Sequence, residues 1–127
     1  MENVVVLAHD EVVRVDETAI SALRAQMGEA GAEGVMNRAL EEIANRLTLI
    51  ERCHFEGERE ALWKAAKGLI GISEQIGLIS VAGASRGVAD CALGRDRVAL
   101  NATMGRLIRL GDRALTAVWS ASESTTY

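Results

Sequence analysis

The sequence predicts an all-α protein, an antiparallel up-and-down four-helix bundle with one additional short N-terminal helix. The 127-residue chain is 49% apolar but only 3% aromatic, a composition that suits closely packed helices better than a β-sandwich. Apolar residues recur at helical spacing along most of the chain. The connections between these stretches are short, which favours antiparallel neighbours. The length predicts one domain, residues 1–127, with an N-terminal arm at 1–12 and a frayed tail at 120–127.

The first two helices are predicted from a cap and from periodicity. A short helix is expected at 16–27, because Asp16 is a suitable N-cap residue. The stretch GEAGAEG at 28–34 is expected to form a turn, with the next helix beginning within it or just after it. The next helix, at 35–53, shows the clearest amphipathic pattern of the chain, with a narrow apolar stripe made of Met36, Leu40, Ile43, Leu47 and Ile50.

Three further helices are expected to complete the bundle. They are predicted at 58–76, 79–93 and 97–119, with Gly77 and the stretch GRD at 94–96 as the turns between them. Residues 4–7 and 12–15 form either an arm against the bundle or a brief strand, and the sequence leaves both alternatives open.

The helix at 58–76 contains glycines in its interior, although each costs a helix roughly 1 kcal/mol relative to alanine. Its apolar side is predicted to be buried and consists of Leu62, Ala65, Ala66, Leu69, Ser73 and Ile76. Gly71 lies in the middle of the opposite, polar side, one turn beyond Lys67, and Gly68 lies at the edge of that side. Gly71 is either neutral drift or a shallow dent where a partner's backbone can approach.

Composition argues against several classes of function. The net charge of −4 and the lack of a basic block disfavour nucleic-acid binding. No apolar run approaches the roughly 20 residues of a membrane span, and the N-terminus does not resemble a signal peptide, so a cytoplasmic location without membrane attachment is predicted. Cys53 and Cys91 are interpreted as small core residues rather than a disulfide or a metal site. No cofactor, metal or catalytic group is predicted.

The interior glycines are part of a longer resemblance. The stretch AKGLIG at 66–71, followed by Ile76-Gly77, resembles the motif of histidine-containing phosphotransfer (HPt) domains, which is Ala-His-x-Leu-Lys-Gly followed by Leu-Gly or Ile-Gly. The flanking stretches ALEEIANRLTLIERCHFEGEREALWKAA (39–66) and VAGASRGVADCALGRD (81–96) resemble the neighbouring helices of that family, so the resemblance covers roughly 13 to 120. Members of the family are four-helix bundles that relay phosphate between receiver domains in two-component signalling.

Two departures from the HPt motif affect its chemistry. Lys67 stands at the position of the phosphorylated histidine, and Ile70 stands at the position of a lysine that would neutralise the phosphoryl group. A lysine amine is protonated at neutral pH and has no free lone pair for the transfer. The resemblance therefore implies a degenerate module that docks a receiver domain or a sensor kinase without phosphotransfer at this position. The expected docking residues are Lys64, Lys67, Gly68, Gly71 and Glu74.

Two other functions stay open. The chain can be a structural or oligomerisation bundle that lost the signalling role, with a second copy of itself as the partner. Alternatively, phosphate enters at His54, which lies at the end of the preceding helix, about three to four helical turns from Lys67.

Overall fold

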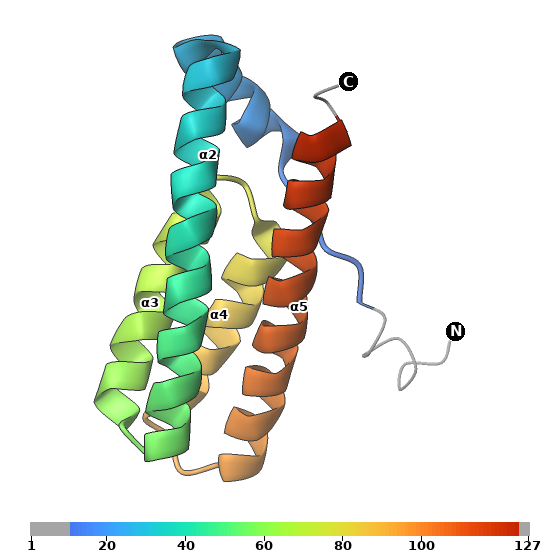
Figure 1. Ribbon diagram of the computed structural model, residues 1–127. Coiled ribbons are helices and arrows are strands. Elements are labelled where there is room, and N and C mark those ends of the chain that lie inside the picture. Colours follow the sequence, from blue (N-terminus) through green and yellow to red (C-terminus); the bar gives the residue numbers. More distant parts are fainter. Residues whose placement is uncertain (1–10, 125–127) are drawn as a thin grey trace.

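The structure, a computed structural model, describes residues 11–124, with side chains described through residue 117. These residues form four helices: α2 (Glu17–Glu56), α3 (Arg59–Gln75), α4 (Ile79–Ala92) and α5 (Arg97–Ser124). Each helix packs against the next one along the chain, and α5 also contacts α2. In Figure 1 the chain turns back at the ends of α2, α3 and α4, and the following helix runs alongside. The prediction of an all-helical bundle is therefore confirmed.

The start of α2 agrees with the predicted cap but not with the predicted turn. The Asp16 carboxylate accepts hydrogen bonds from the backbone N–H groups of Thr18 and Ala19, at 3.0 and 3.3 Å. The break is much shorter than the predicted turn at 28–34, because only Gly28 leaves the helical region (φ 76°, ψ 172°) and helix resumes within the stretch. Glycine permits a positive φ but does not require one. The kink at Gly28 changes the direction of the chain, as the upper part of Figure 1 shows.

The helix ends follow from local chemistry. Gly57 takes the left-handed conformation (φ 73°) after α2, and the N–H of Glu58 donates to the carbonyl of Cys53 at 2.9 Å. Asp96 caps α5 by accepting from the N–H of Ala99 at 2.9 Å. The α5 helix extends to Ser124, so the prediction that fraying begins after 119 is wrong for 120–124, since no glycine or proline stops the helix there. Residues 125–127 lie outside the described part.

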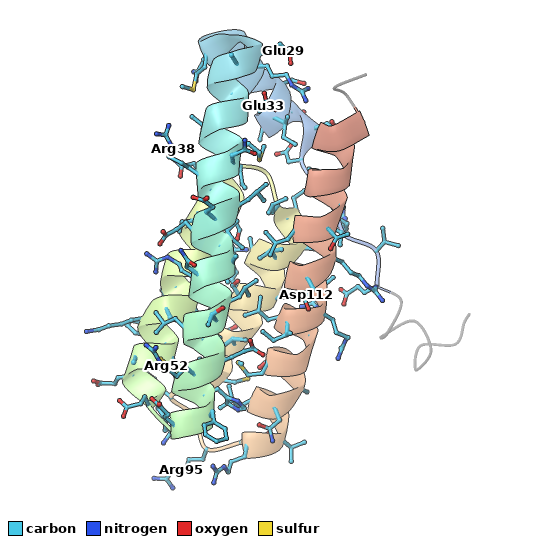
Figure 2. All side chains as sticks on the ribbon, in the orientation of Figure 1. Glu29, Glu33, Arg38, Arg52, Arg95 and Asp112 are labelled. Carbon is cyan, nitrogen blue, oxygen red and sulfur yellow. The ribbon has the colours of Figure 1, made fainter. Side chains whose placement is uncertain are left out.

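The core is a layer of aliphatic side chains contributed by all four helices. Large side chains that are at most 1% exposed include Ile43, Ile50, Leu62, Leu69, Leu78, Val81, Val88, Leu107 and Leu110. Alanines fill much of the remaining interior, which lets the helices approach closely. Charged side chains such as Arg38 and Arg52 lie on the outside of α2 (Figure 2). No helix in the described residues is both long and apolar enough to pass through a membrane.

The segment 11–16 lies extended along the start of α4. Val15 and Leu78 form an isolated antiparallel bridge, and the N–H of Asp16 donates to the carbonyl of Gly77 at 2.7 Å. The N–H of Arg14 donates to the hydroxyl of Ser80, also at 2.7 Å. Residues 12–15 are thus an arm with a single β-bridge. The segment 4–7, for which the sequence left the same alternatives open, lies outside the described residues.

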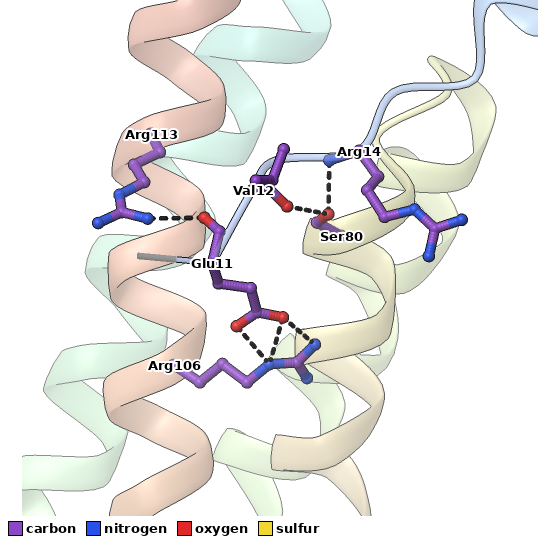
Figure 3. A network of polar contacts seen from close by, with 6 residues as sticks. All are labelled: Glu11, Val12, Arg14, Ser80, Arg106 and Arg113. Carbon is purple, nitrogen blue, oxygen red and sulfur yellow. Dashed lines mark hydrogen bonds and ion pairs between the residues drawn. The ribbon is translucent and has the colours of Figure 1, made fainter. Parts of the chain in front are cut away.

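Glu11 fastens this arm to α5. Its carboxylate accepts hydrogen bonds from the Arg106 guanidinium at 2.8 to 3.2 Å, and its backbone carbonyl accepts one from Arg113 at 2.6 Å (Figure 3). The Arg106 hydrogen bonds lower the pKa of the Glu11 carboxyl below its ordinary value of 4.5, against the opposing effect of partial burial. The charged carboxylate is therefore the form that stabilises the folded state.

The Glu11→Gln variant should be less stable than the wild type by about 0.5 kcal/mol at pH 7, a small loss because the ion pair is partly exposed to solvent. A carboxyl with a lowered folded-state pKa stabilises the protein above its unfolded-state pKa, and this contribution disappears as the pH falls through the folded-state pKa. Urea denaturation at neutral pH and well below the ordinary pKa should show the difference shrinking in acid. Glu41→Gln, at an exposed position on α2, is the matched control. A difference that is unchanged in acid would contradict the proposed role of the carboxylate.

Candidate docking face on helix α3

The α3 helix has a buried side and an exposed side, as its sequence predicts. Its buried residues are Leu62, Ala65, Ala66, Leu69 and Ser73, and Ile76 directly after the helix is also buried. Four of the five expected docking residues, Lys64, Lys67, Gly71 and Glu74, are exposed, and the fifth, Gly68, is half-buried. The structure therefore places Lys67 away from the core, on the surface.

Gly71 lies in open space on this side of the helix. A Cβ atom built at Gly71 would meet no atom within 4 Å. The rest of the chain therefore does not require glycine at this position on steric grounds. The dent that it leaves is accessible to the main chain of a partner.

Gly68 differs from Gly71, because a side chain of α2 covers it. A Cβ atom at Gly68 would overlap the guanidinium of Arg46, whose Cζ atom would be only 3.1 Å away. The Nε of Arg46 also donates to the carboxylate of Glu42 at 3.0 Å, which holds the guanidinium in place. The absence of a side chain at Gly68 thus lets Arg46 lie across the edge of α3. Arg46 is not among the residues predicted from the sequence, although the glycine at the edge of the face was a signal that a neighbouring side chain covers it.

The exposed side of α3 carries two positive and two negative side chains, Lys64 and Lys67 with Glu60 and Glu74. Lys64 and Lys67 are the two lysines of the chain, and neither forms an ion pair with a described residue. The ammonium of Lys67 lies 5.8 Å from the ring centroid of Trp63, one turn earlier, in a cation–π arrangement. Glu74 is paired with Arg86 of α4, and the arginine partly neutralises its charge. Lys67, one turn before Gly71, therefore presents a positive charge that has no ion-pair partner among the described residues.

The remaining candidate residues lie elsewhere. Ile70, at the position of the motif lysine, is half-buried and packs against the core. His54 lies at the far end of α2, where its Nε2 is 3.0 Å from the side-chain oxygen of Asn101 on α5. Cys53 is buried in the core as expected, Cys91 is half-buried, and both are free thiols. No cluster of metal-ligating side chains occurs among the residues with described positions.

Comparison of the chain with protein-family models, with curated proteins and with solved structures finds no match.

Proposed function

We propose that this protein is an HPt-like module that docks the receiver domain of a response regulator through the exposed side of α3, without transferring phosphate at position 67. The observation that carries the proposal is the outward-facing Lys67, one turn before the open dent at Gly71. The antiparallel up-and-down arrangement of HPt domains, with the segment before Gly28 as an additional short helix, is part of the proposal. The order of helix contacts and the kink at Gly28 support it.

The proposed partner is chosen because its charge is opposite to that of Lys67. Receiver domains have an acidic pocket at their phosphorylation site, and Lys67 lies where an HPt domain would present its histidine to that pocket. A fixed positive charge there favours association and orients the two proteins. The protonated amine cannot take up a phosphoryl group as an imidazole nitrogen can. Such a module would occupy a receiver domain and block competent partners. A sensor kinase that presents an acidic surface is the alternative partner.

Calorimetric titration against receiver domains of the same genome tests this proposal. Lys67→Glu should weaken the affinity about tenfold or more, because it replaces attraction by repulsion at the centre of the contact. Gly71→Trp should weaken it to a similar extent by filling the dent. Arg38→Glu, an exposed charge reversal on the outside of α2 (Figure 2), should leave the affinity unchanged and serves as the control.

The same titration separates the alternatives. Equal affinities for the wild type and both α3 variants would remove this face from consideration. Self-association in sedimentation experiments, combined with no receiver binding, would favour an oligomerisation bundle. Acid-labile label that is transferred from a phosphorylated receiver and lost in His54→Ala would instead establish phosphotransfer through His54.

A further inference from the structure

A groove separates α2 from α5 at the end of the bundle where α2 turns into α3 and α4 turns into α5. Its volume is about 1430 Å³, and its apolar lining includes Leu62, Leu100, Met104 and Ile108. Farther along the two helices the groove closes, because Gly111 lets α5 approach Leu47 so closely that an added Cβ would lie 2.7 Å from the leucine. Near the loop end, the hydrogen bond between His54 and Asn101 links the two walls.

The charged residues that line the groove are mostly basic. They comprise Arg59, Arg95, Arg97 and Arg109, against the two acidic residues Glu51 and Asp96. Arg59 donates to the carbonyls of Ala92 and Gly94, and Asp96 is occupied as the cap of α5. Arg95 and Arg97 are exposed and form no ion pair with a residue of the described segment. Figure 2 shows Arg95 projecting from this end of the molecule.

An exposed aromatic side chain stands at the edge of the same groove. Phe55 is the single phenylalanine of the chain, and its side chain is 90% exposed in the last turn of α2. Leu93 and Val98, which flank the loop that lines the groove, are 51% and 79% exposed. Aromatic residues beside an apolar pocket with arginines at its rim are typical of the anchor points of protein interfaces.

We propose that the α2–α5 groove binds an amphipathic helix of a partner protein, with acidic residues along its apolar stripe. The volume exceeds the roughly 300 to 1,000 Å³ of most small-ligand sites, whereas an amphipathic helix in an apolar groove is a common mode of recognition. Phe55 packs against the apolar stripe of that helix, and Arg95 and Arg97 pair with its carboxylates. This site does not depend on the proposed receiver docking. The start of α3 contributes Arg59 and Leu62 to the groove, but none of the five residues of the docking face lines it.

An anionic membrane surface is the alternative partner for this end of the bundle, which is both basic and apolar. The groove favours a peptide, because its apolar lining is recessed and the carboxylates of Glu51 and Asp96 stand among its arginines. These two carboxylates would repel anionic lipid headgroups. A helix can instead place its acidic side chains beside the arginines and away from the two carboxylates.

A fluorescein-labelled peptide of about 18 residues is the probe, with leucines at positions i, i+3, i+4 and i+7 and glutamates beside them. Fluorescence anisotropy should show saturable binding of this peptide to the intact protein. A counterpart with lysine in place of each glutamate should bind at least about tenfold more weakly. Phe55→Ala and Arg97→Glu should each weaken binding of the acidic peptide about tenfold or more. Both positions are exposed, so thermal unfolding should stay unchanged and show that the variants are folded.

Arg38→Glu is the matched control, since it makes the same charge reversal at an exposed position of α2 that does not line the groove, and it should leave peptide binding intact. Failure of the acidic peptide to bind at millimolar concentration would overturn the proposal. Equal binding of a scrambled acidic peptide would do the same. Binding of phosphatidylglycerol vesicles that is lost in Phe55→Ala and Arg97→Glu, without peptide binding, would assign this end of the bundle to membranes.

Discussion

Replacing Leu69 by alanine is expected to lower the free energy of unfolding by about 2 to 5 kcal/mol, because the change leaves a cavity among well-packed side chains. Leu69 is fully buried on the inner side of α3 and belongs to the core formed by all four helices. Urea denaturation followed by far-ultraviolet circular dichroism measures the loss. Lys67→Ala, two residues away on the exposed side of the same helix, should change stability by less than about 0.5 kcal/mol.

This pair of variants also tests the orientation of α3 on which the docking face depends. If Leu69→Ala cost much less than 1 kcal/mol and Lys67→Ala cost more, the helix would be rotated and Lys67 would not face a partner. If the losses are as expected, Lys67 can be replaced in binding experiments without disturbing the fold. Changes in receiver affinity at position 67 would then report on the contact itself.

The inner side of α3 could be predicted from the sequence because burial follows the helical repeat. Leu62, Leu69 and Ile76 share one side of the helix and are all buried. The ends of the helices could also be predicted wherever a single residue determines the local geometry. The Asp16 side chain caps the N–H groups of the residues that follow it, so it marks the start of α2. Gly77 takes a left-handed conformation directly after α3 and marks the end of that helix.

The stretch at 28–34 shows where this local reasoning fails. Its three glycines predict a turn, but Gly31 and Gly34 stay helical while Ala32 is buried. Each glycine destabilises a helix by about 1 kcal/mol relative to alanine. Tertiary packing of a long helix can offset this cost. Local propensity alone therefore could not distinguish Gly28, which kinks the chain, from the two glycines after it.

The contacts that shape the two surfaces depend on residues far apart in the sequence. Arg46 lies over Gly68 only because α2 and α3 pack side by side, and the α2–α5 groove exists only where those helices diverge beyond Gly111. Phe55 was not distinguishable from a core aromatic by its type, since aromatic side chains are usually buried. These features required the tertiary arrangement of the helices, which no single periodic pattern contains.

The Gly77→Ala variant is expected to lose about 2 to 3 kcal/mol of stability for two separate reasons. Gly77 has a φ of 77°, a conformation that costs residues with a side chain roughly 1 to 2 kcal/mol. In addition, the new Cβ would lie 2.8 Å from the carbonyl oxygen of Asp16, so the backbone of the arm would have to move. That movement would strain the hydrogen bond from the Asp16 N–H to the Gly77 carbonyl and with it the attachment of the arm.

Gly57→Ala separates the two contributions. Gly57 has nearly the same φ, 73°, but a Cβ built there would meet nothing within 4 Å, so its loss should reflect backbone strain alone. Urea denaturation of both variants should therefore give the larger loss for Gly77→Ala. Hydrogen exchange at the Asp16 amide should accelerate in that variant and not in Gly57→Ala. Equal losses in the two variants, with unchanged exchange at Asp16, would show that the arm adapts to a side chain at Gly77 without cost.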